Sequence, residues 1–369
     1  MQLQVQEVKT LSAVSLNTDQ IHPAEFSKLL AKQDLKNDLQ SALDILETRP
    51  DWKHEDIGDE LDREFFSQPG RHGLIGGRTR TGKTTLIYHL TDGILSHGKE
   101  HIATLDTGKS SEFLTNALFQ PLRILVPKGL PRTQKMELSI EMNPDAPDTL
   151  KKKYGFTDAM IRNFLKNFDN SVVVPIDVRN ETWSECRKGE IAVISIKRFI
   201  PDPYLYSKIV ADMATNLVYA TWDHVLQDLP FCLILDEFQQ IAPSRKNCIV
   251  PGQLEAGKII GSNLEVMASM GVRFLCGTQG YGKLLPTVRD NFETIFIKRG
   301  IRFFRDIGRL YDFEPLWNKV PTTHCYIARP DGSFTDPYRV PIYPAGWELG
   351  TVRYNGRLDG TKLNKKTLR

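Results

Sequence analysis

The 369-residue sequence is poor in the features that mark secreted, zinc-binding and membrane proteins. Its five cysteines are odd in number and include no C-x-x-C pair, which argues against a disulfide framework or a zinc site and favours a reducing compartment. No apolar run approaches the roughly 18 residues needed to cross a bilayer. The N-terminus also lacks the basic-then-apolar pattern of a secretion signal. We therefore expect a cytoplasmic protein without a membrane span.

Positive and negative side chains nearly balance, with a net charge of only +3. The net charge therefore says little about binding partners. Its distribution is uneven: residues 1–68 carry about 14 acids and 7 bases, and the last 17 residues carry six bases and one acid. The composition is otherwise globular, with 40% hydrophobic and 25% charged residues, so the chain can bury a sizeable core.

The pattern of apolar residues divides the chain into parts. It is helical from Pro23, and Gln68-Pro69-Gly70 marks a boundary, so we predict a helical, acidic accessory region at 1–68. Strand-like and helical runs alternate over 69–345, which predicts an α/β core with a mainly parallel sheet. Within this core, residues at about 130–189 are expected to form an insertion, and residues 346–369 are expected to form a basic C-terminal tail.

Several of the expected strands are continuous apolar runs, as in strands that are buried on both faces. Long helical patterns lie at 204–228 and 252–270, and a hairpin with a Pro-Asp-Gly turn begins at Cys325. The expected strands of the sheet are 71–75, 101–106, 122–126, 190–196, 231–235, 272–276 and 293–298.

Residues 77–84 read GRTRTGKT and match the phosphate-binding pattern G-x-x-x-x-G-K-[ST], between a predicted strand and a predicted helix. The N–H groups of such a loop and the start of the helix cradle an anion. Lys83 would reach the β- and γ-phosphates of ATP, and the Thr84 hydroxyl would hold Mg²⁺. The residues expected to bind the nucleotide are Gly77, Arg78, Thr79, Arg80, Thr81, Gly82, Lys83, Thr84 and Thr85.

The second half of the expected site follows two later strands. The run Phe231-Cys-Leu-Ile-Leu ends in Asp236 and Glu237, at the edge where α/β sheets bind their ligands. Asp236 would orient Mg²⁺, and Glu237 would accept a proton from the attacking water. Gln279 ends a further strand and is expected to contact the γ-phosphate or the water.

In this order and spacing, the segments resemble the FtsK/HerA superfamily of ATPases, which includes type IV secretion coupling proteins and viral genome-packaging ATPases. The resemblance covers roughly residues 70–340 and includes Ile102–Asp106, Gly189–Ile196, Leu233–Gln239 and Gly271–Gln279. It implies a RecA-like P-loop NTPase core and a homohexameric ring that threads double-stranded DNA. A packaging ATPase would be associated with a virion.

The sequence departs from that family at two positions that concern positive charge near the phosphates. Arg80 stands where the family commonly has glycine, and Ala268 stands where many members have an arginine that reaches into the next subunit's site. A substitute cation is therefore expected from Arg273, Arg289, Lys298 or Arg299, and Arg299 is preferred. The stretch 283–309 holds seven bases that would suit DNA phosphates in a pore, or would simply form a solvated face; Tyr281 and Lys283 are candidates for a loop facing that pore.

These observations favour an ATP-driven motor that translocates double-stranded DNA, in genome packaging or conjugative-type transfer. The accessory region 1–68 would then dock a partner such as a capsid, a secretion channel or a nuclease. A nucleotide-switched scaffold that moves no DNA is the alternative, favoured by the neutral total charge and by Ala268. A kinase is disfavoured by Glu237, since many kinases lack a second acid there.

Overall fold

The computed structural model describes residues 23–48, 61–98, 100–108, 110–128, 137–223, 230–304, 309–329, 331–354 and 357–358. The chain forms two compact units, Met1–Arg49 and Pro50–Arg369. In the first unit, helix α2 (Pro23–Thr48) begins at the predicted proline, whose fixed φ suits a first helical turn. The expected apolar stripe is half-buried along a mostly exposed helix and comprises Leu35, Leu39, Leu43 and Leu46. Residues 1–22 and 49–60 of the predicted accessory region lie outside the described residues.

The second unit is built on one ten-stranded sheet in the order β11-β10-β9-β1-β8-β7-β2-β6-β3-β5. The eight strands from β9 to β5 are parallel, and β10 and β11 add an antiparallel edge. This is the α/β, RecA-like arrangement that the sequence predicted. The strands are β1 (Gly73–Gly76), β2 (His101–Leu105), β3 (Leu122–Pro127), β5 (Val172–Ile176), β6 (Ile191–Ile194), β7 (Phe231–Leu235), β8 (Val272–Thr278), β9 (Thr294–Ile297), β10 (His324–Ala328) and β11 (Tyr338–Arg339).

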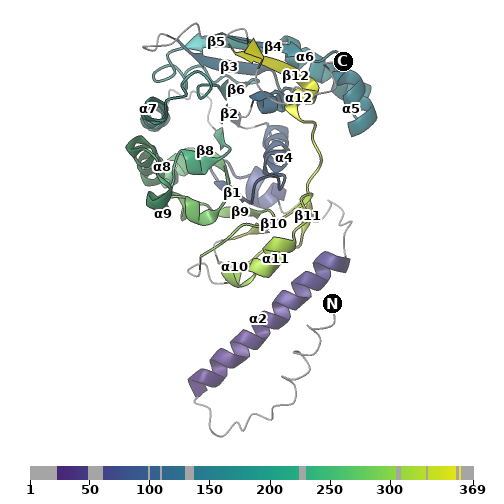
Figure 1. Ribbon diagram of the computed structural model, residues 1–369, viewed down its shortest axis with the longest axis vertical. Helices are drawn as coiled ribbons and strands as arrows, with labels where there is room; N and C mark the ends of the chain where they lie inside the picture. Colours follow the sequence, from purple (N-terminus) through teal and green to yellow (C-terminus); the bar gives the residue numbers. More distant parts are fainter. Residues whose placement is uncertain are drawn as a thin grey trace. The chain divides into compact units, whose positions relative to one another are not determined.

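Helices cover both faces of this sheet (Figure 1). On one face lie α7 (Pro203–Trp222) and α8 (Pro251–Ser269), in the predicted helical stretches 204–228 and 252–270, together with the short α9 (Pro286–Arg289), which was not predicted. On the other lie α4 (Lys83–Ser96) and the 3₁₀ segment η3 (Ser110–Leu118). Every residue of β1, β3, β6, β7, β8, β9 and β10 is buried, as expected of strands enclosed on both sides.

The boundary between the units differs from the one predicted at 68/69, because residues 61–68 belong to the second unit. They include the π-helical turn η2 (Asp62–Phe66), and the Leu61, Phe65 and Phe66 side chains are buried in the same core cluster as α4. The acidic residues around them determined the sequence prediction, but these three apolar side chains determine where the segment packs.

A buried ion pair ties this segment to the sheet. Arg273 of β8 is fully buried and pairs with Glu100 at 2.7 Å, donates to the Gln68 carbonyl at 2.7 Å, and stacks on Phe65 at 4.4 Å. Burial raises the pKa of Glu100 to about 7, outweighing the opposite effect of Arg273.

We expect Glu100→Ala to destabilise the protein strongly, because it leaves the Arg273 guanidinium buried without its carboxylate. The free energy of unfolding should fall by about 3–5 kcal/mol, measured by urea denaturation at pH 8, where Glu100 is charged. A loss below about 1 kcal/mol, the level of an exposed ion pair, would contradict this assignment.

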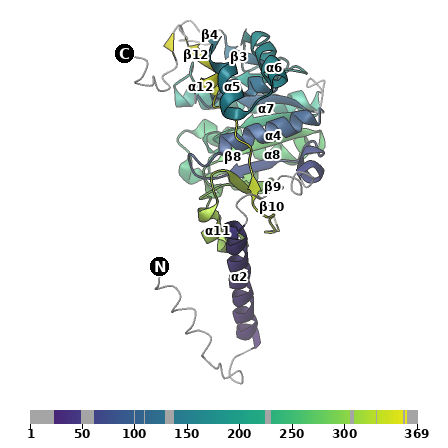
Figure 2. The same cartoon turned by 90° about the vertical axis from the view of Figure 1, so that its right-hand side faces the viewer.

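The predicted insertion and the predicted tail form one structure together. The insertion contains β4 (Leu138–Met142), α5 (Ala146–Tyr154) and α6 (Asp158–Asp169), and then returns to the main sheet as β5. Residues of the expected tail form α12 (Gly346–Leu349), β12 (Gly350–Tyr354) and β13 (Arg357–Leu358), and β12 pairs antiparallel with β4 (Figure 2). The tail prediction is therefore corrected for 346–354, because Leu349 and Val352 are buried in the core.

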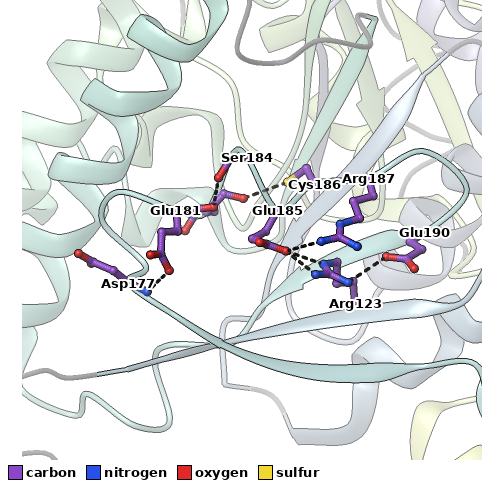
Figure 3. A network of polar contacts seen from close by, with 9 residues as sticks. Arg123, Asp177, Glu181, Ser184, Glu185, Cys186, Arg187 and Glu190 are labelled. Atoms are coloured by element: carbon purple, nitrogen blue, oxygen red, sulfur yellow. Dashed lines mark hydrogen bonds and ion pairs between the residues drawn. The ribbon is translucent and has the colours of Figure 1, made fainter.

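A polar network holds the loop before β6 against β3 (Figure 3). Arg123 of β3 donates to Glu185, at 3.0 Å from its Nε, and lies 3.6 Å from Glu190; Arg187 adds a contact to Glu185 at 3.4 Å. The neighbouring Cys186 thiol contacts the Thr182 carbonyl, and burial raises its pKa to about 12, which keeps it an unreactive thiol at neutral pH. This network is a structural brace rather than a site.

The remaining elements close the β10–β11 edge of the sheet. Helices α10 (Arg309–Asp312) and α11 (Glu314–Lys319) precede the predicted hairpin, and the buried Trp317 packs on Tyr326 of β10. All five cysteines are free, and Cys232 and Cys276 are buried in the neighbouring strands β7 and β8, as predicted. Across the described residues, no helix combines the length and apolar character that a membrane crossing requires.

Candidate nucleotide site

The predicted site residues meet at the carboxyl edge of three adjacent strands. The loop 77–82 follows β1, Gln279 follows β8, and Asp236 and Glu237 follow β7. Because β1, β8 and β7 are parallel neighbours in the sheet, their carboxyl ends lie side by side. Residues about 200 positions apart in the sequence are thereby gathered around the start of α4.

Two glycines give the loop its shape. The Gly77 N–H donates to the Thr278 carbonyl at 3.1 Å, and a Cβ on Gly77 would lie 2.6 Å from the Cβ of Lys298, so only glycine fits. Gly82 adopts φ +81° at the start of α4, a left-handed conformation that favours glycine. The loop therefore enters α4 with the first N–H groups of the helix unbonded within it.

The Lys83 amine lies inside the loop. Lys83 is the first residue of α4, and its Nζ donates to the carbonyls of Gly77 at 3.0 Å and Arg78 at 3.1 Å. Arg78, Thr79 and Arg80 are exposed, so the loop opens to solvent rather than folding shut on the sheet. Thr81 closes the turn through its hydroxyl, which donates to the Arg78 carbonyl at 2.7 Å.

The two predicted Mg²⁺ ligands are neighbours. The Thr84 hydroxyl lies 3.4 Å from Asp236 Oδ2, beside a cavity of about 50 Å³ that both residues line together with Asp106 and Glu112. No cluster of three or more His, Cys, Asp or Glu side chains suited to a metal occurs among the described residues. One carboxylate and one hydroxyl nevertheless fit Mg²⁺, which keeps several waters and takes further oxygens from substrate phosphates.

Glu237 is held in an unusual conformation. Glu237 has a backbone φ of +57° and is only 5% exposed, and its N–H donates to Asp236 Oδ1 at 2.9 Å. A non-glycine residue in this region costs about 1–3 kcal/mol, and such residues cluster at functional sites. Gln279 donates from Nε2 to Glu237 Oε2 at 2.7 Å, so the predicted base directly contacts the residue expected to touch the γ-phosphate or the water.

A second glutamine contacts the same carboxylate and was missed by the sequence reasoning. Gln239, in the 3₁₀ turn η4 (Phe238–Gln240), donates from Nε2 to Glu237 Oε2, and its Oε1 accepts from the Gln279 N–H at 3.4 Å. The sequence did show that Gln239 lies two residues after Glu237. A tight turn at that point returns the Gln239 side chain to the end of the strand.

The tip of β6 supplies a cation that was also not predicted. Lys197 donates to the Gln240 side chain and lies 5.4 Å above the Tyr206 ring. Burial lowers its pKa, while the charges of Asp106 and Glu237 act in the opposite direction. A lysine three residues after a buried strand was a visible but weak signal for a residue at the same edge.

Three of the four candidates for a cation reaching a neighbouring subunit are engaged within their own chain. Arg273 and Lys298 are fully buried, and the Lys298 amine donates to the carbonyls of Thr322 at 2.6 Å and His324 at 2.8 Å. Burial lowers the pKa of Lys298 to about 8. Arg289 packs against the rings of Tyr281 at 5.2 Å and Phe304 at 5.0 Å.

Arg299 is exposed and lies next to the loop of its own chain, since its carbonyl accepts from the Arg78 N–H at 3.0 Å. Its side chain donates to the Asn318 carbonyl at 3.2 Å. A catalytic role for Arg299 in a neighbouring subunit remains a prediction.

The basic stretch 283–309 does not form a single face. Lys298 is buried, whereas Lys283, Arg299 and Arg302 are exposed, and the side chains of Arg305 and Arg309 lie outside the described residues. Tyr281 lies in the 3₁₀ turn η6 (Tyr281–Lys283) and is only 6% exposed. The expected pore loop is therefore corrected at Tyr281, whose ring is covered, while Lys283 remains exposed.

Comparison with known proteins gives a likeness of fold. No family model matches the chain, and no curated protein matches it. Among solved structures, it is similar to the genome packaging NTPase B204 from Sulfolobus turreted icosahedral virus 2 in complex with AMPPCP, with 13% identity, 74% of this chain and 99% of that chain covered, and a TM-score of 0.38. It is also similar to the bacterial conjugative coupling protein TrwB, with 12% identity, 75% and 86% coverage, and a TM-score of 0.44. A packaging ATPase and a coupling protein are the two kinds of protein that the sequence resemblance named.

Arg80 adopts φ +64° in the loop, at the position where the resemblance led us to expect glycine. We expect Arg80→Gly to leave the free energy of unfolding unchanged or to raise it by up to about 1 kcal/mol, because relief of a left-handed non-glycine residue offsets the added chain entropy. Arg80→Val should lower it, since β-branched residues tolerate this region worst. Urea denaturation of the two variants in parallel checks the order; Arg80→Val as stable as Arg80→Gly would contradict it.

Proposed function

We propose that this protein is an ATP-hydrolysing motor that translocates double-stranded DNA, as a homohexameric ring, in genome packaging or conjugative-type transfer. The observation that carries the hydrolysis is the convergence of the loop containing Lys83 with the Thr84–Asp236 pair and the Glu237–Gln279 pair. A phosphate cradle, a metal anchor and a water-activating acid are the parts that ATP hydrolysis requires.

In the proposed reaction, ATP binds with its phosphates over the loop and the start of α4, where the Lys83 amine exchanges loop carbonyls for phosphate oxygens. Mg²⁺, when bound by Thr84 and Asp236, neutralises charge on the phosphates. Glu237 accepts a proton from water as the water oxygen bonds to the γ-phosphorus. The bond from that phosphorus to the β,γ-bridging oxygen breaks, and ADP and phosphate leave.

Gln279 and Gln239 position the base in this scheme. Both amides donate to the same Glu237 oxygen, Oε2, which fixes the orientation of the carboxylate at the end of β7. Gln279 follows β8, so loss of the γ-phosphate near Gln279 would alter the hydrogen bond between Gln279 and Glu237 and the position of the end of β8. We propose this as the step that reports the state of the nucleotide.

The DNA-moving part of the proposal is supported by the order of the motifs and by the exposed cations Lys283 and Arg302, which suit phosphates without reading sequence. Helix α2, with its half-buried leucine stripe, is the proposed docking segment for a capsid, a secretion channel or a nuclease. A virion or the cytoplasm is the proposed location.

The test is ATP hydrolysis measured with and without long double-stranded DNA, together with sizing of the particle in the presence of an ATP analogue. Stimulation by long duplex that falls as salt rises supports a motor. Hydrolysis without stimulation by any nucleic acid would instead support the nucleotide-switched scaffold. A chain that transfers phosphate to a small acceptor without DNA would revive the kinase.

A further inference from the structure

ATP hydrolysis of the proposed kind needs positive charge near the γ-phosphate beyond the loop lysine, because charge spreads over the γ-oxygens in the transition state. Ala268 cannot supply it. The structure also engages Arg273, Lys298 and Arg289 inside their own chain, as described above. Arg299, the fourth candidate, is exposed, but its side chain donates to the Asn318 carbonyl of its own chain. A cation on the phosphate loop itself is therefore a further candidate.

Arg78, the second residue of the loop, has its main chain fixed and its side chain exposed. Its N–H donates to the Arg299 carbonyl at 3.0 Å, and its carbonyl accepts from Lys83 and Thr81. Arg302 pairs with Glu314 at 3.6 Å, whereas no carboxylate of the described residues pairs with Arg78. The Arg78 guanidinium thus stays available for an anion.

The Arg78 side chain packs against the backbone of Gly300 beside the loop. Gly300 has φ +74°, and a Cβ there would lie 2.6 Å from Arg78 Cδ and 2.8 Å from its Nε. A side chain at position 300 would displace the Arg78 stem. The absence of a side chain at Gly300 therefore lets Arg78 lie close to the chain that follows β9.

Arg78 and Gly300 line an open groove of about 750 Å³ at the edge of the sheet where the site residues meet. Arg78 and Thr79 form one part of the wall, Gln279 and Gly280 another, and Lys283 and Arg302 also line it. Gln279 is the residue that donates to Glu237, so Arg78 faces the same space as the group that positions the base.

We propose that Arg78 is a catalytic cation acting in cis. Its guanidinium moves away from Gly300 and donates to γ-phosphate oxygens of the ATP that is bound by its own loop. It thereby replaces the arginine that a neighbouring subunit supplies in related motors. The inference rests on the proposed hydrolysis. Arg78 forms no covalent bond. The water oxygen bonds to the γ-phosphorus, the bond from that phosphorus to the leaving oxygen of ADP breaks, and Glu237 receives the proton of the water. The planar guanidinium suits two phosphate oxygens at once.

The first experiment compares steady-state ATP hydrolysis by wild type, Arg78→Ala and Arg78→Lys, with Arg162→Ala on α6 as a matched exposed control. We expect Arg78→Ala to lower kcat by about 10³-fold while the Kd for a fluorescent ATP analogue stays within about threefold. Arg78→Lys, which keeps the charge but not the fork, should fall between the two, and Arg162→Ala should match wild type. An Arg78→Ala enzyme with wild-type kcat overturns the inference.

The second experiment separates cis from trans action by mixing Arg78→Ala with Lys83→Ala. If Arg78 served a neighbour's site, an Arg78→Ala subunit would receive an intact arginine from a Lys83→Ala subunit, and activity would return. Action in cis predicts no recovery, and recovery overturns the proposal. Wild type without ATP hydrolysis would contradict the proposed function itself, whereas active wild type with active Arg78→Ala contradicts only this inference.

Discussion

Replacing Glu237 by glutamine is expected to leave ATP binding intact and to lower kcat by about 10²–10⁴-fold, the range for loss of a general base. Glutamine has nearly the same shape, and its side-chain oxygen can still accept from Gln279 and Gln239. It cannot accept the proton of the attacking water. The protein should therefore keep its fold and its nucleotide affinity and lose only turnover.

Steady-state hydrolysis and binding of a fluorescent ATP analogue together test this expectation. Glu265→Gln on the exposed side of α8 is a matched control, because it makes the same chemical change away from the site. A Glu237→Gln enzyme that hydrolyses ATP at the normal rate would show that another group activates the water.

Lys83→Ala is expected to abolish both tight ATP binding and hydrolysis, with a loss in kcat/KM of at least about 10²–10³-fold, the effect of removing one charge-stabilising donor. The Lys83 amine lies inside the loop, where it donates to the carbonyls of Gly77 and Arg78. Without it, the triphosphate loses its principal cation and the Gly77 carbonyl loses the lysine as a donor, whereas the Arg78 carbonyl still accepts from the Thr81 hydroxyl.

Nucleotide affinity, hydrolysis and the urea midpoint should be measured on the same preparation, so that loss of the site is distinguished from loss of the fold. Lys208→Ala, an exposed lysine on α7, serves as the control. Lys83→Ala with unchanged affinity for ATP would place the phosphates somewhere other than the loop.

The core of the fold followed from the sequence because its determinants are local. Continuous apolar runs marked the buried strands, and the Gly77–Thr84 pattern fixed the loop between β1 and α4. The convergence of Thr84 with Asp236 then followed from a general property of parallel sheets, whose strand ends share one edge. No knowledge of distant packing was needed for that step.

What the sequence did not predict depends on side chains that meet across the fold. Gln239 reaches Glu237 only because η4 turns back on the strand end, and Lys197 reaches Gln240 only because of the order of the strands. The burial of Arg273 and Lys298 could not be seen either, because charged residues are seldom fully buried and their partners lie far along the chain.

The pairing of β4 with β12 has a consequence for biosynthesis. Arg353 and Glu141, which bridge these strands at 3.0 Å, are 212 positions apart. During translation, at about 5–20 residues per second, β4 emerges from the ribosome some ten seconds or more before its partner exists. During that interval Leu138 and Ile140 of β4 lack the partners Tyr354 and Val352 with which they pair in the folded protein, so this segment is expected to need protection by a chaperone while the polypeptide is being made.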